Sequence, residues 1–532
     1  MKKLLSVFLA ATLLVSVIGL SYAEEGAYTM PVRLLSPEKT TVTYMTPMHA
    51  LQTNLDDYQY IADLEAATNV HLDATWVAAG QWSEKKNLTL AGGVSELPDI
   101  LNGVSGTDIA TYGPQGYFVP IDEYLSEDLT PNLLALFEKY PDYKAAITSS
   151  DGHIYQLPTI NMLPFRQSPF NMFINTEWLN KLNLPVPTNY QELYDVLVAF
   201  RDNDCNGNGD AGDEIPLAGN WQGGTDYFRW VFLFAMFGFP VESDMLYVND
   251  DYKVCLAPLE PGYDVALTYF KKLYAEGLLD PETFTQDNAA YTAKGQQDPA
   301  RYGIYFDWFG TVVAGEANFA QYDVLAPMAG PGGKTVWTNR GTRGFYGGGG
   351  VAVSAGASDI KTCIGWLDYL YNPEISMQTT RGNIGTVLYF DEADGKYHSY
   401  DAPEGYTADS FRVLNVPAEA VPYAFMADQV AKIVLPANMQ RKIDVFYPVN
   451  AQYMSKNYLP ALNLTLEESN DLAIYQADIG SYLQKMIPAF ITGQADIETG
   501  FADFQKQLEA MGTAEYLNIY QTGYDRFLAA AK

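Results

Sequence analysis

The sequence predicts an α/β protein of two lobes, followed by a helical C-terminal region. Two observations support this fold class. Short apolar stretches typical of strands alternate with amphipathic stretches typical of helices, first over residues 41–101 and again over residues 171–200. Residues 465–532 then show helical periodicity almost throughout. Alternation of strands and helices favours parallel sheets that are covered by helices on their faces.

In the first lobe, helices are predicted where apolar residues recur every three or four positions. Tyr60, Leu64 and Ala67 share one face of such a helix, and Pro131 stands in the first turn of another, where its missing N–H is tolerated. Asp151-Gly152 marks a turn before a strand. The predicted strands are residues 41–44, 70–76, 97–101 and 153–157, and the predicted helices are residues 56–68, 82–91 and 131–140.

The second lobe repeats this pattern, with capping residues before its helices. Thr176 and Thr188 each stand before a helix as a candidate cap, and Glu192 lies near the capping-box position. The C-terminal helices start at Thr465, and Thr492-Gly493 predicts one break in them. The predicted elements are a strand at residues 171–175 and helices at 176–182, 190–200, 260–276 and 359–371.

Two stretches are predicted to carry the chain from one lobe to the other. They are residues 159–170 and the glycine-rich residues 340–350. Two crossings make each lobe discontinuous, and a cleft between two such lobes is a common small-molecule site. The expected division is residues 1–23 as a signal peptide, 24–165 with 345–420 as lobe 1, and 166–344 with 421–532 as lobe 2.

The N-terminus has the pattern of a secretory signal. Lys2 and Lys3 precede an apolar run over residues 4–20, and Ser21-Tyr22-Ala23 places small residues where a signal peptidase cleaves. A membrane anchor is the competing interpretation, but the small residues after the run favour cleavage after Ala23. No Cys lies near that site to carry a lipid, so we expect a secreted protein, either periplasmic or associated with the cell surface.

The charge of the chain limits the classes of partner that it can bind, and its cysteine content indicates the state of its thiols. The chain holds 32 basic and 64 acidic residues, a net charge of −32, which becomes −34 once the two lysines of residues 1–23 are removed. Such a surface repels nucleic acids and anionic lipids, and it keeps a protein soluble and monomeric. Cys205, Cys255 and Cys363 are far apart and odd in number, so we expect free, buried thiols.

The sharpest local motif is the acidic, glycine-containing stretch of residues 202–214. Alternating oxygen side chains in one loop suit Ca²⁺, which takes six to eight oxygen ligands. The motif is similar to an EF-hand but has no Glu at the twelfth position, and a solvated turn is the alternative. Counting from Asp204 puts Gly209 at the sixth position and is preferred to counting from Asp202. The predicted ligands are Asp204, Asn206, Asn208, Asp210 (through its side chain or backbone), Asp213 and Glu214.

The sequence contains no complete motif for nucleotide binding and none of the catalytic motifs sought. Residues 332–335 look like the end of a phosphate loop, but Met328 stands where its first glycine is required. There is no G-x-S-x-G and no H-E-x-x-H. A glycosidase needs only two carboxylates, which leave no motif. A secreted glycan hydrolase or lyase therefore remains an alternative to a binding protein.

Aromatic residues at predicted turns suggest the ligand. Sugar rings stack on aromatic rings while their hydroxyls bond to polar side chains. Trp308 ends a predicted strand, where ligands of open α/β sheets bind, and Trp221 follows a turn; core packing is the alternative for each. Arg381 is a weaker candidate. The predicted ligand contacts are Tyr44, Asn102, Trp221, Trp308 and Arg343.

Several motifs in order give the chain a family resemblance. They are residues 95–100 (SELPDI), 116–122 (GYFVPID), 151–158 (DGHIYQLP), 174–179 (INTEWL), 213–217 (DEIPL), 490–493 (FITG) and 514–526. Over nearly the whole mature chain the sequence resembles the extracellular solute-binding proteins of family 1, the receptors of carbohydrate ABC importers. One extra residue precedes Asp213 relative to the family's calcium loop.

The resemblance implies a type 2 periplasmic-binding-protein fold, in which two lobes close on a ligand by a hinge. It implies a non-enzymatic receptor that carries an oligosaccharide or related solute to an ABC permease, with structural Ca²⁺ in the acidic loop. The sequence departs from most relatives in lacking the lipidated Cys. A sensory or adhesive protein of the same fold is a further alternative.

Overall fold

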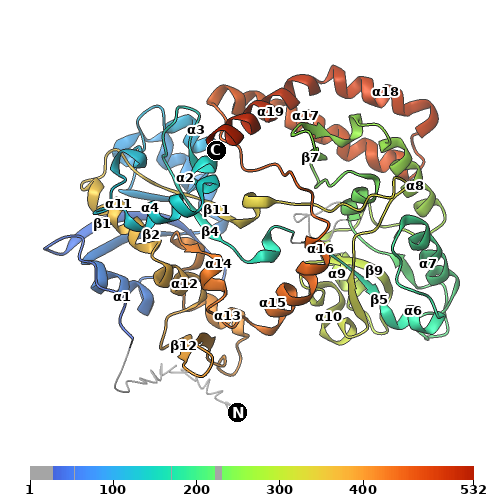
Figure 1. The fold of residues 1–532 in the computed structure, drawn as a ribbon, viewed down its shortest axis with the longest axis horizontal. Helices are drawn as coiled ribbons and strands as arrows, with labels where there is room; N and C mark the ends of the chain where they lie inside the picture. Colours follow the sequence, from blue (N-terminus) through green and yellow to red (C-terminus); the bar gives the residue numbers. More distant parts are fainter. Residues whose placement is uncertain (1–27, 53, 169, 222–229, 532) are drawn as a thin grey trace, which may run out of the picture.

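The computed structural model describes residues 28–52, 54–168, 170–221 and 230–531. Two sheets lie at opposite ends of the long axis of the molecule, each packed with helices, and they form the centres of two α/β lobes (Figure 1). The predicted signal peptide, residues 1–23, falls outside the described residues. Within the described ranges, no helix is long and apolar enough to cross a membrane.

The first lobe contains a six-stranded sheet in the order β14-β4-β11-β3-β1-β2. Strand β1 is parallel to β2 and β3, and β14 is parallel to β4, but β11 is antiparallel to both of its neighbours. The sheet is therefore mixed, because β11 enters it on the return from the second lobe. The strands are β1 (Thr40–Met48), β2 (Val70–Ala78), β3 (Ile100–Val104), β4 (Leu157–Asn161), β11 (Tyr346–Val353) and β14 (Ala424–Phe425).

Helices cover this sheet and supply its buried apolar core. They are α1 (Gln59–Thr68), α2 (Trp82–Ala91), α3 (Gly106–Tyr112), α4 (Pro131–Lys139), α5 (Pro141–Ile147), α11 (Ile360–Leu370) and α12 (Pro373–Arg381). Helices α1, α2 and α4 fall where the apolar periodicity predicts them. The three cysteines of the chain are buried and free, as expected.

Two predicted strands start too early, one three residues before β3 and the other four residues before β4. The sequence predicts a strand over residues 153–157, whereas β4 starts at Leu157. Ile154 bonds to residues 121–122 instead: its carbonyl accepts from Ile121 N at 2.7 Å, and its N–H donates to Asp122 Oδ1 at 2.8 Å. In this segment, a hydrogen bond to a side chain thus replaces the hydrogen bond to a neighbouring strand.

The second lobe contains a four-stranded sheet in the order β10-β5-β9-β6. Only β6 and β9 are parallel. The strands are β5 (Asn171–Asn175), β6 (Ile215–Leu217), β9 (Tyr302–Asp307) and β10 (Tyr322–Leu325), and β7 (Leu246–Val248) and β8 (Val254–Leu256) form a separate hairpin. The helices are α6 (Thr176–Leu182), α7 (Tyr190–Asp202), α8 (Tyr263–Ala275), α9 (Asn288–Gly295) and α10 (Thr311–Phe319).

Two helix caps are asparagines next to the predicted threonines, Asn175 one residue before Thr176 and Asn189 one residue after Thr188. Asn175 Oδ1 accepts from Trp178 N at 3.0 Å and caps α6, and Asn189 Oδ1 accepts from two N–H groups and caps α7. Thr188 instead bonds to the Glu192 carboxylate. Asn and Thr cap helices by the same acceptor geometry, so the sequence places the cap only to within a residue.

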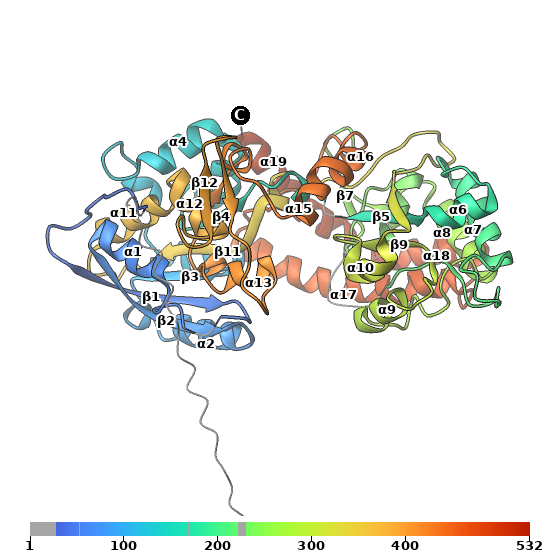
Figure 2. The ribbon, with the colours of Figure 1, turned by 90° about the horizontal axis from the view of Figure 1, so that it is seen from below.

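The C-terminal region consists of three helices, α17 (Leu466–Ile491), α18 (Ile497–Ala510) and α19 (Thr513–Ala530), with two breaks instead of the predicted one. Figures 1 and 2 show them running along one side of the molecule. Their buried side chains, such as Phe490, Phe504 and Leu508, belong to the core of the second lobe. Helix α17 packs against α8 and also touches α3 of the first lobe.

The chain crosses between the lobes through the 3-10 turns Pro164–Arg166 and Gly341–Phe345. These two crossings lie against each other, because Arg340 N donates to Gln167 O at 2.8 Å and Arg166 Nε donates to Gly344 O at 3.1 Å. The predicted lobe boundaries at residues 165 and 344 fall in these turns. The boundary after residue 420 precedes β14, which pairs with β4 in the first sheet, so it is placed a few residues too early.

The segment between α12 and α17 adds small elements near the crossings. It passes through α13 (Ala408–Val413) and β14, and it reaches the second lobe through a π-helical turn, Lys442–Phe446. The other elements are hairpin β12 (Leu388–Asp391) and β13 (Lys396–Ser399), and helices α14 (Ala427–Val430), α15 (Ala437–Arg441) and α16 (Tyr447–Ala451).

Candidate functional site

A cavity of about 630 Å³ lies between the two lobes. The first lobe lines it with the end of β1 and with parts of β3 and β4, the second lobe with Trp308 and Phe309 directly after β9, and the first crossing with Leu163, Phe165 and Arg166. The carboxyl ends of strands in open α/β sheets are where ligands bind. The size and position of the cavity suit a small-molecule ligand.

Two of the five predicted ligand contacts, Asn102 and Trp308, line this cavity. Asn102 Nδ2 donates to Thr46 Oγ1 at 3.0 Å, which ties the amide of this β3 residue to β1. The Trp308 ring stands edge-on to Phe165, with ring centroids 5.6 Å apart. An aromatic ring and an amide that line one cavity are what a polar ring-shaped ligand requires.

The Trp308 ring is held from behind by a buried lysine. Lys442 Nζ lies 3.2 Å from the centroid of the ring, and the side chain is fully buried. Burial lowers the pKa of Lys442 well below its usual value, whereas the nearby Asp307 carboxylate acts to raise it. Burial also raises the pKa of Asp307 to about 6. The Asp307 carboxylate accepts from the N–H groups of Phe309 and Val313, so the turn after β9 is firmly fixed.

Tyr44 and Trp221 are core residues, contrary to prediction. Tyr44 lies on the same face of β1 as Val42, is 1% exposed, and donates its hydroxyl to Ala420 O at 2.7 Å. Trp221 is 2% exposed and packs on Trp230, with ring centroids 6.0 Å apart. Other parts of the protein cover both aromatic rings, so neither ring offers a face to a ligand.

Arg343 also lies outside the cavity. Its Nη2 donates to Glu242 Oε1 at 2.6 Å, and Arg340 binds the same carboxylate. Burial acts to raise the pKa of Glu242, but the two guanidinium groups outweigh it and lower that pKa below its usual value. The ion pair holds Arg343 at the second crossing, beside a separate small pocket.

Most lining residues are not among the predicted contacts, and they include Arg166, Phe309, Arg412 and Tyr423. Arg166 falls in a predicted crossing, and Phe309 follows the predicted Trp308, so position alone points to both. Arg412 and Tyr423 belong to a stretch without a recognisable motif. Arg381, the weaker candidate, lines the cavity.

The predicted metal loop joins α7 to β6 in the second lobe, and none of its described residues lines the cavity. The Asp204 carboxylate accepts from the N–H groups of Gly207, Asn208 and Gly209. Gly207 and Gly209 have φ of 80° and 93°, which requires glycine. The loop therefore folds around the carboxylate that the preferred register places first.

The other predicted ligands are joined by hydrogen bonds within the loop. The side-chain amides of Asn206 and Asn208 donate to the two oxygens of Asp213 at 3.0 and 2.9 Å. Glu214 Oε1 accepts from Cys205 N and Asn206 N, while its buried Oε2 has no hydrogen-bond partner among the described residues. Burial raises the pKa of Glu214. The orphaned carboxylate oxygen fits a hard cation, although no three carboxylates of this described loop place an oxygen within 4.8 Å of one another.

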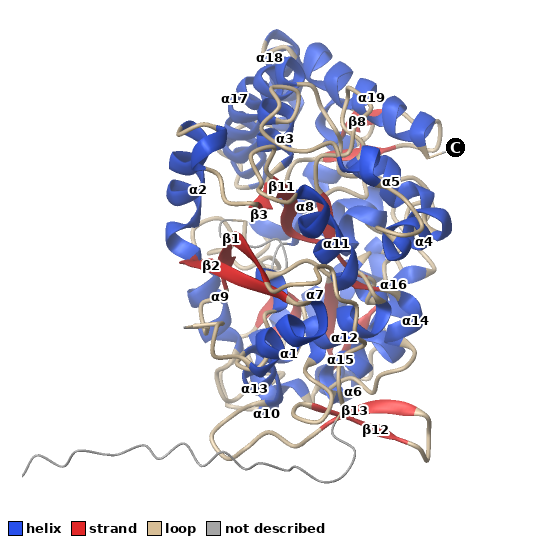
Figure 3. Ribbon diagram, turned by 90° about the vertical axis from the view of Figure 1, so that its left-hand side faces the viewer, coloured by secondary structure: helices blue, strands red, loops and turns tan. Residues whose placement is uncertain are grey.

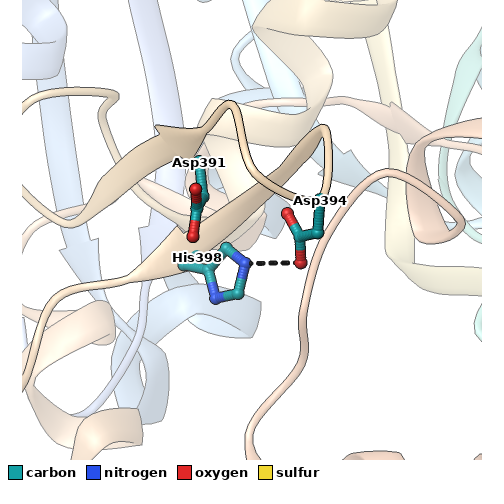
Figure 4. Close-up of side chains that lie close together, drawn as sticks. All are labelled: Asp391, Asp394 and His398. Carbon is teal, nitrogen blue, oxygen red and sulfur yellow. Dashed lines mark hydrogen bonds and ion pairs between the residues drawn. The ribbon is translucent and has the colours of Figure 1, made fainter.

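A second group of metal-donor atoms lies on the β12–β13 hairpin, which stands at the edge of the molecule (Figures 3 and 4). Asp391, Asp394 and His398 place one donor atom each within 4.8 Å of one another. His398 Nε2 lies 2.9 Å from Asp394 Oδ2. Calcium prefers oxygen ligands to imidazole, and a surface ion pair accounts for this contact, so this group is distinct from the predicted calcium loop.

Two α/β lobes with a ligand-sized cavity between them define a two-lobed binding protein. The chain belongs to the bacterial extracellular solute-binding proteins, because the model of that family matches residues 50–377. This confirms the family and the fold class that the sequence motifs predict.

Individual relatives support the same family assignment. The fructooligosaccharide ABC transporter substrate-binding protein FusA of Streptococcus pneumoniae is 31% identical, over 92% of this chain and 91% of FusA. The structure of FusA in complex with kestose superposes with a TM-score of 0.74 at 29% identity, covering 92% of this chain and 99% of that one. A solute-binding protein from Bifidobacterium longum subsp. infantis gives 0.80 at 25% identity, with 92% and 98% covered. An EF-hand mutant of FusA has also been solved, in complex with fructo-nystose.

Proposed function

We propose that the protein is the receptor of an ABC importer, which captures an oligosaccharide in the cavity between its lobes and delivers it to membrane permease subunits. The observation that carries this proposal is the cavity itself, which combines Trp308 of one lobe with Asn102 of the other. The naming of FusA as a fructooligosaccharide receptor supports the same class of ligand.

Binding energy comes from stacking and hydrogen bonds. A sugar ring lies with its C–H face on Trp308, and its hydroxyls bond to side chains such as Asn102 and Asn161. Because these side chains come from both lobes, a ligand makes all its contacts only in the closed form and shifts the population toward closure. The protein acts as a carrier and leaves its ligand chemically unchanged.

We further propose that the loop of residues 204–214 holds a structural Ca²⁺. The proposed ligands are Asp204, Asn206, Asn208, Asp210, Asp213 and Glu214, and the orphaned Oε2 of Glu214 supports a cation there. The EF-hand of FusA supports a cation site in this family. The cation supplies charge that holds the loop closed at the end of α7, away from the cavity.

The remaining proposals concern the state and location of the protein. It is secreted after cleavage behind Ala23 and works outside the cell as a monomer. Its net charge of −34 after cleavage supports a soluble monomer that does not bind nucleic acids.

A thermal-shift screen of the mature protein, with and without Ca²⁺, tests these proposals. A ligand at 100 times its dissociation constant stabilises the native state by about 2.7 kcal/mol. We expect an oligosaccharide to raise the melting temperature and to be recovered unchanged after long incubation. Consumption of the saccharide would instead identify a hydrolase or lyase, and the absence of any saccharide shift would contradict the receptor function.

A further inference from the structure

Positive side chains gather in the cavity although the chain as a whole is strongly acidic. Arg166, Arg381 and Arg412 line it, so three of the eleven arginines of the sequence border one space. Among the lining residues whose side chains the structure describes, there is no Asp or Glu. The whole chain holds 64 acidic residues against 32 basic ones. The cavity therefore has a local potential opposite to that of the surrounding surface, and a cleft concentrates such a field.

The three arginines come from separate elements, and each is anchored. Arg166 stands on the first crossing and donates from Nε to Gly344 O at 3.1 Å. Arg381 ends α12, is only 6% exposed, and donates from Nη1 to Met439 Sδ at 3.6 Å. Arg412 of α13 donates from Nη1 to Thr380 O at 2.8 Å. Anchored guanidinium groups lose little further freedom when they bind a ligand.

Arg166 lies close to the proposed stacking platform. It directly follows Phe165, whose ring touches Trp308 edge-on. Its hydrogen bond to Gly344 O uses only Nε, which leaves the two Nη groups at the outer end of the guanidinium. A sugar ring that stacks on Trp308 therefore has Arg166 within reach of its substituents.

The lining is rich in charged donors and poor in charged acceptors. A neutral sugar presents hydroxyls that donate as well as accept, and carboxylate side chains are strong acceptors for them. A carboxylate on the ligand only accepts, and a guanidinium binds it through two parallel hydrogen bonds. The described side chains of the cavity thus match an acceptor-rich, negatively charged sugar better than a neutral one.

We propose that the ligand is an anionic oligosaccharide, in which the carboxylate of a uronic acid or similar acidic sugar binds Arg166 while a sugar ring stacks on Trp308. Arg381 and Arg412 supply positive potential to the same cavity. This inference rests on the proposed function as a saccharide receptor and specifies its ligand class. It separates the protein from a receptor for neutral saccharides such as kestose.

Isothermal titration of the mature protein with matched ligands tests the inference. The probes are trigalacturonate, trimannuronate and 3′-sialyllactose, each paired with its carboxyl-reduced neutral counterpart, together with kestose. We expect at least one acidic probe to bind 10- to 100-fold more tightly than its reduced counterpart, as one charged hydrogen-bonded contact predicts. Its dissociation constant should rise with added NaCl, because salt screens the attraction.

Variants assign the effect to Arg166. Arg166→Gln should weaken binding of the acidic probe by 10- to 100-fold and reduce the advantage over its neutral counterpart, with Arg166→Lys in between. Arg343→Gln is the matched control, because Arg343 is held by Glu242 outside the cavity, and it should change neither affinity. The comparison of matched ligands on the wild-type protein needs no variant, so it stands if a variant fails to fold.

The remaining outcomes separate this inference from the function on which it rests. If neutral probes bind as tightly as the acidic ones, or if Arg166→Gln weakens both kinds equally, the anionic ligand class is wrong while the receptor function holds. Binding of kestose with no binding of any carboxylate probe also overturns the carboxylate assignment. If no saccharide binds, both proposals fail.

Discussion

Alanine substitutions at two tryptophans should separate ligand binding from folding. Trp308 lines the cavity, whereas Trp221 is 2% exposed and packs in the core of the second lobe. The sequence alone places both at the ligand. The structure predicts that only Trp308→Ala weakens ligand binding and that Trp221→Ala acts on stability.

The expected loss of affinity follows from the position of the Trp308 ring. An aromatic ring at the centre of a binding site contributes about 2 kcal/mol, which corresponds to a roughly 30-fold rise in the dissociation constant. Trp308→Ala also uncovers Lys442, whose Nζ lies 3.2 Å from the ring centroid, so some stability is lost as well. Trp308→Phe keeps a ring over Lys442 and should give a smaller loss of both affinity and stability.

Trp221→Ala should have the opposite profile. Its ring packs on Trp230 and on Phe284, with centroids 6.0 and 6.1 Å away, and removal of a buried Trp typically costs about 3–5 kcal/mol of folding free energy. The dissociation constant of the saccharide from Trp221→Ala should stay within about twofold of the wild-type value at a temperature where the variant is folded.

The assays are calorimetric titration with the tightest-binding saccharide and thermal unfolding without ligand. If folded Trp221→Ala binds as weakly as Trp308→Ala, the assignment of Trp221 to the core is refuted. If Trp308→Ala binds like wild type, Trp308 is not the stacking platform.

Three further predictions concern the metal loop, the hinge and a buried carboxyl group. Asp213→Ala should abolish the rise in melting temperature on adding Ca²⁺, whereas Asp202→Ala, whose carboxylate pairs with Arg201 outside the proposed ligand set, should retain most of it. An alanine Cβ at Gly344 would lie 2.2 Å from a backbone oxygen of the other crossing, so Gly344→Ala should cost about 1–3 kcal/mol and weaken saccharide binding, while Gly332→Ala, with open space around it, should do neither. Burial raises the pKa of Asp307 to about 6, so its folded form binds a proton more tightly than its unfolded form; thermal scans should show wild type losing stability relative to Asp307→Asn as pH rises from 4 to 7.

Local sequence patterns predict most of the helices and strands because local forces define them. The apolar face of α1 and the turn before β4 are visible in the sequence, and the capping box of α17 starts at Thr465 as expected. The start of β4 is misplaced because Asp122, about 30 residues earlier, bonds to Ile154. Contacts of that range leave no local pattern.

The site is harder to predict because six or more chain segments meet in it. Trp308 is recognisable, since it directly follows a strand, where ligands of such folds bind. Tyr44 also stands in a strand near the site. Because side chains alternate along β1, however, Tyr44 shares the buried face of the strand with Val42. Arg412 reaches the cavity only through the packing of α13, which no motif marks.

The position of Arg166 at the hinge couples the charge of the ligand to the closure of the two lobes. Arg166 stands on one crossing and bonds to Gly344 on the other, so a carboxylate held there lies at the hinge. A shift from 1% to 99% closed requires about 5.5 kcal/mol of preferential binding to the closed form. Stacking on Trp308 contributes about 2 kcal/mol and a charged hydrogen bond about 1.5–3 kcal/mol. Neither contact alone is sufficient, whereas the two together approach the required value. A ligand must therefore have both a stacking ring and a negative charge to hold most of the molecules closed, and in this way closure itself selects the ligand.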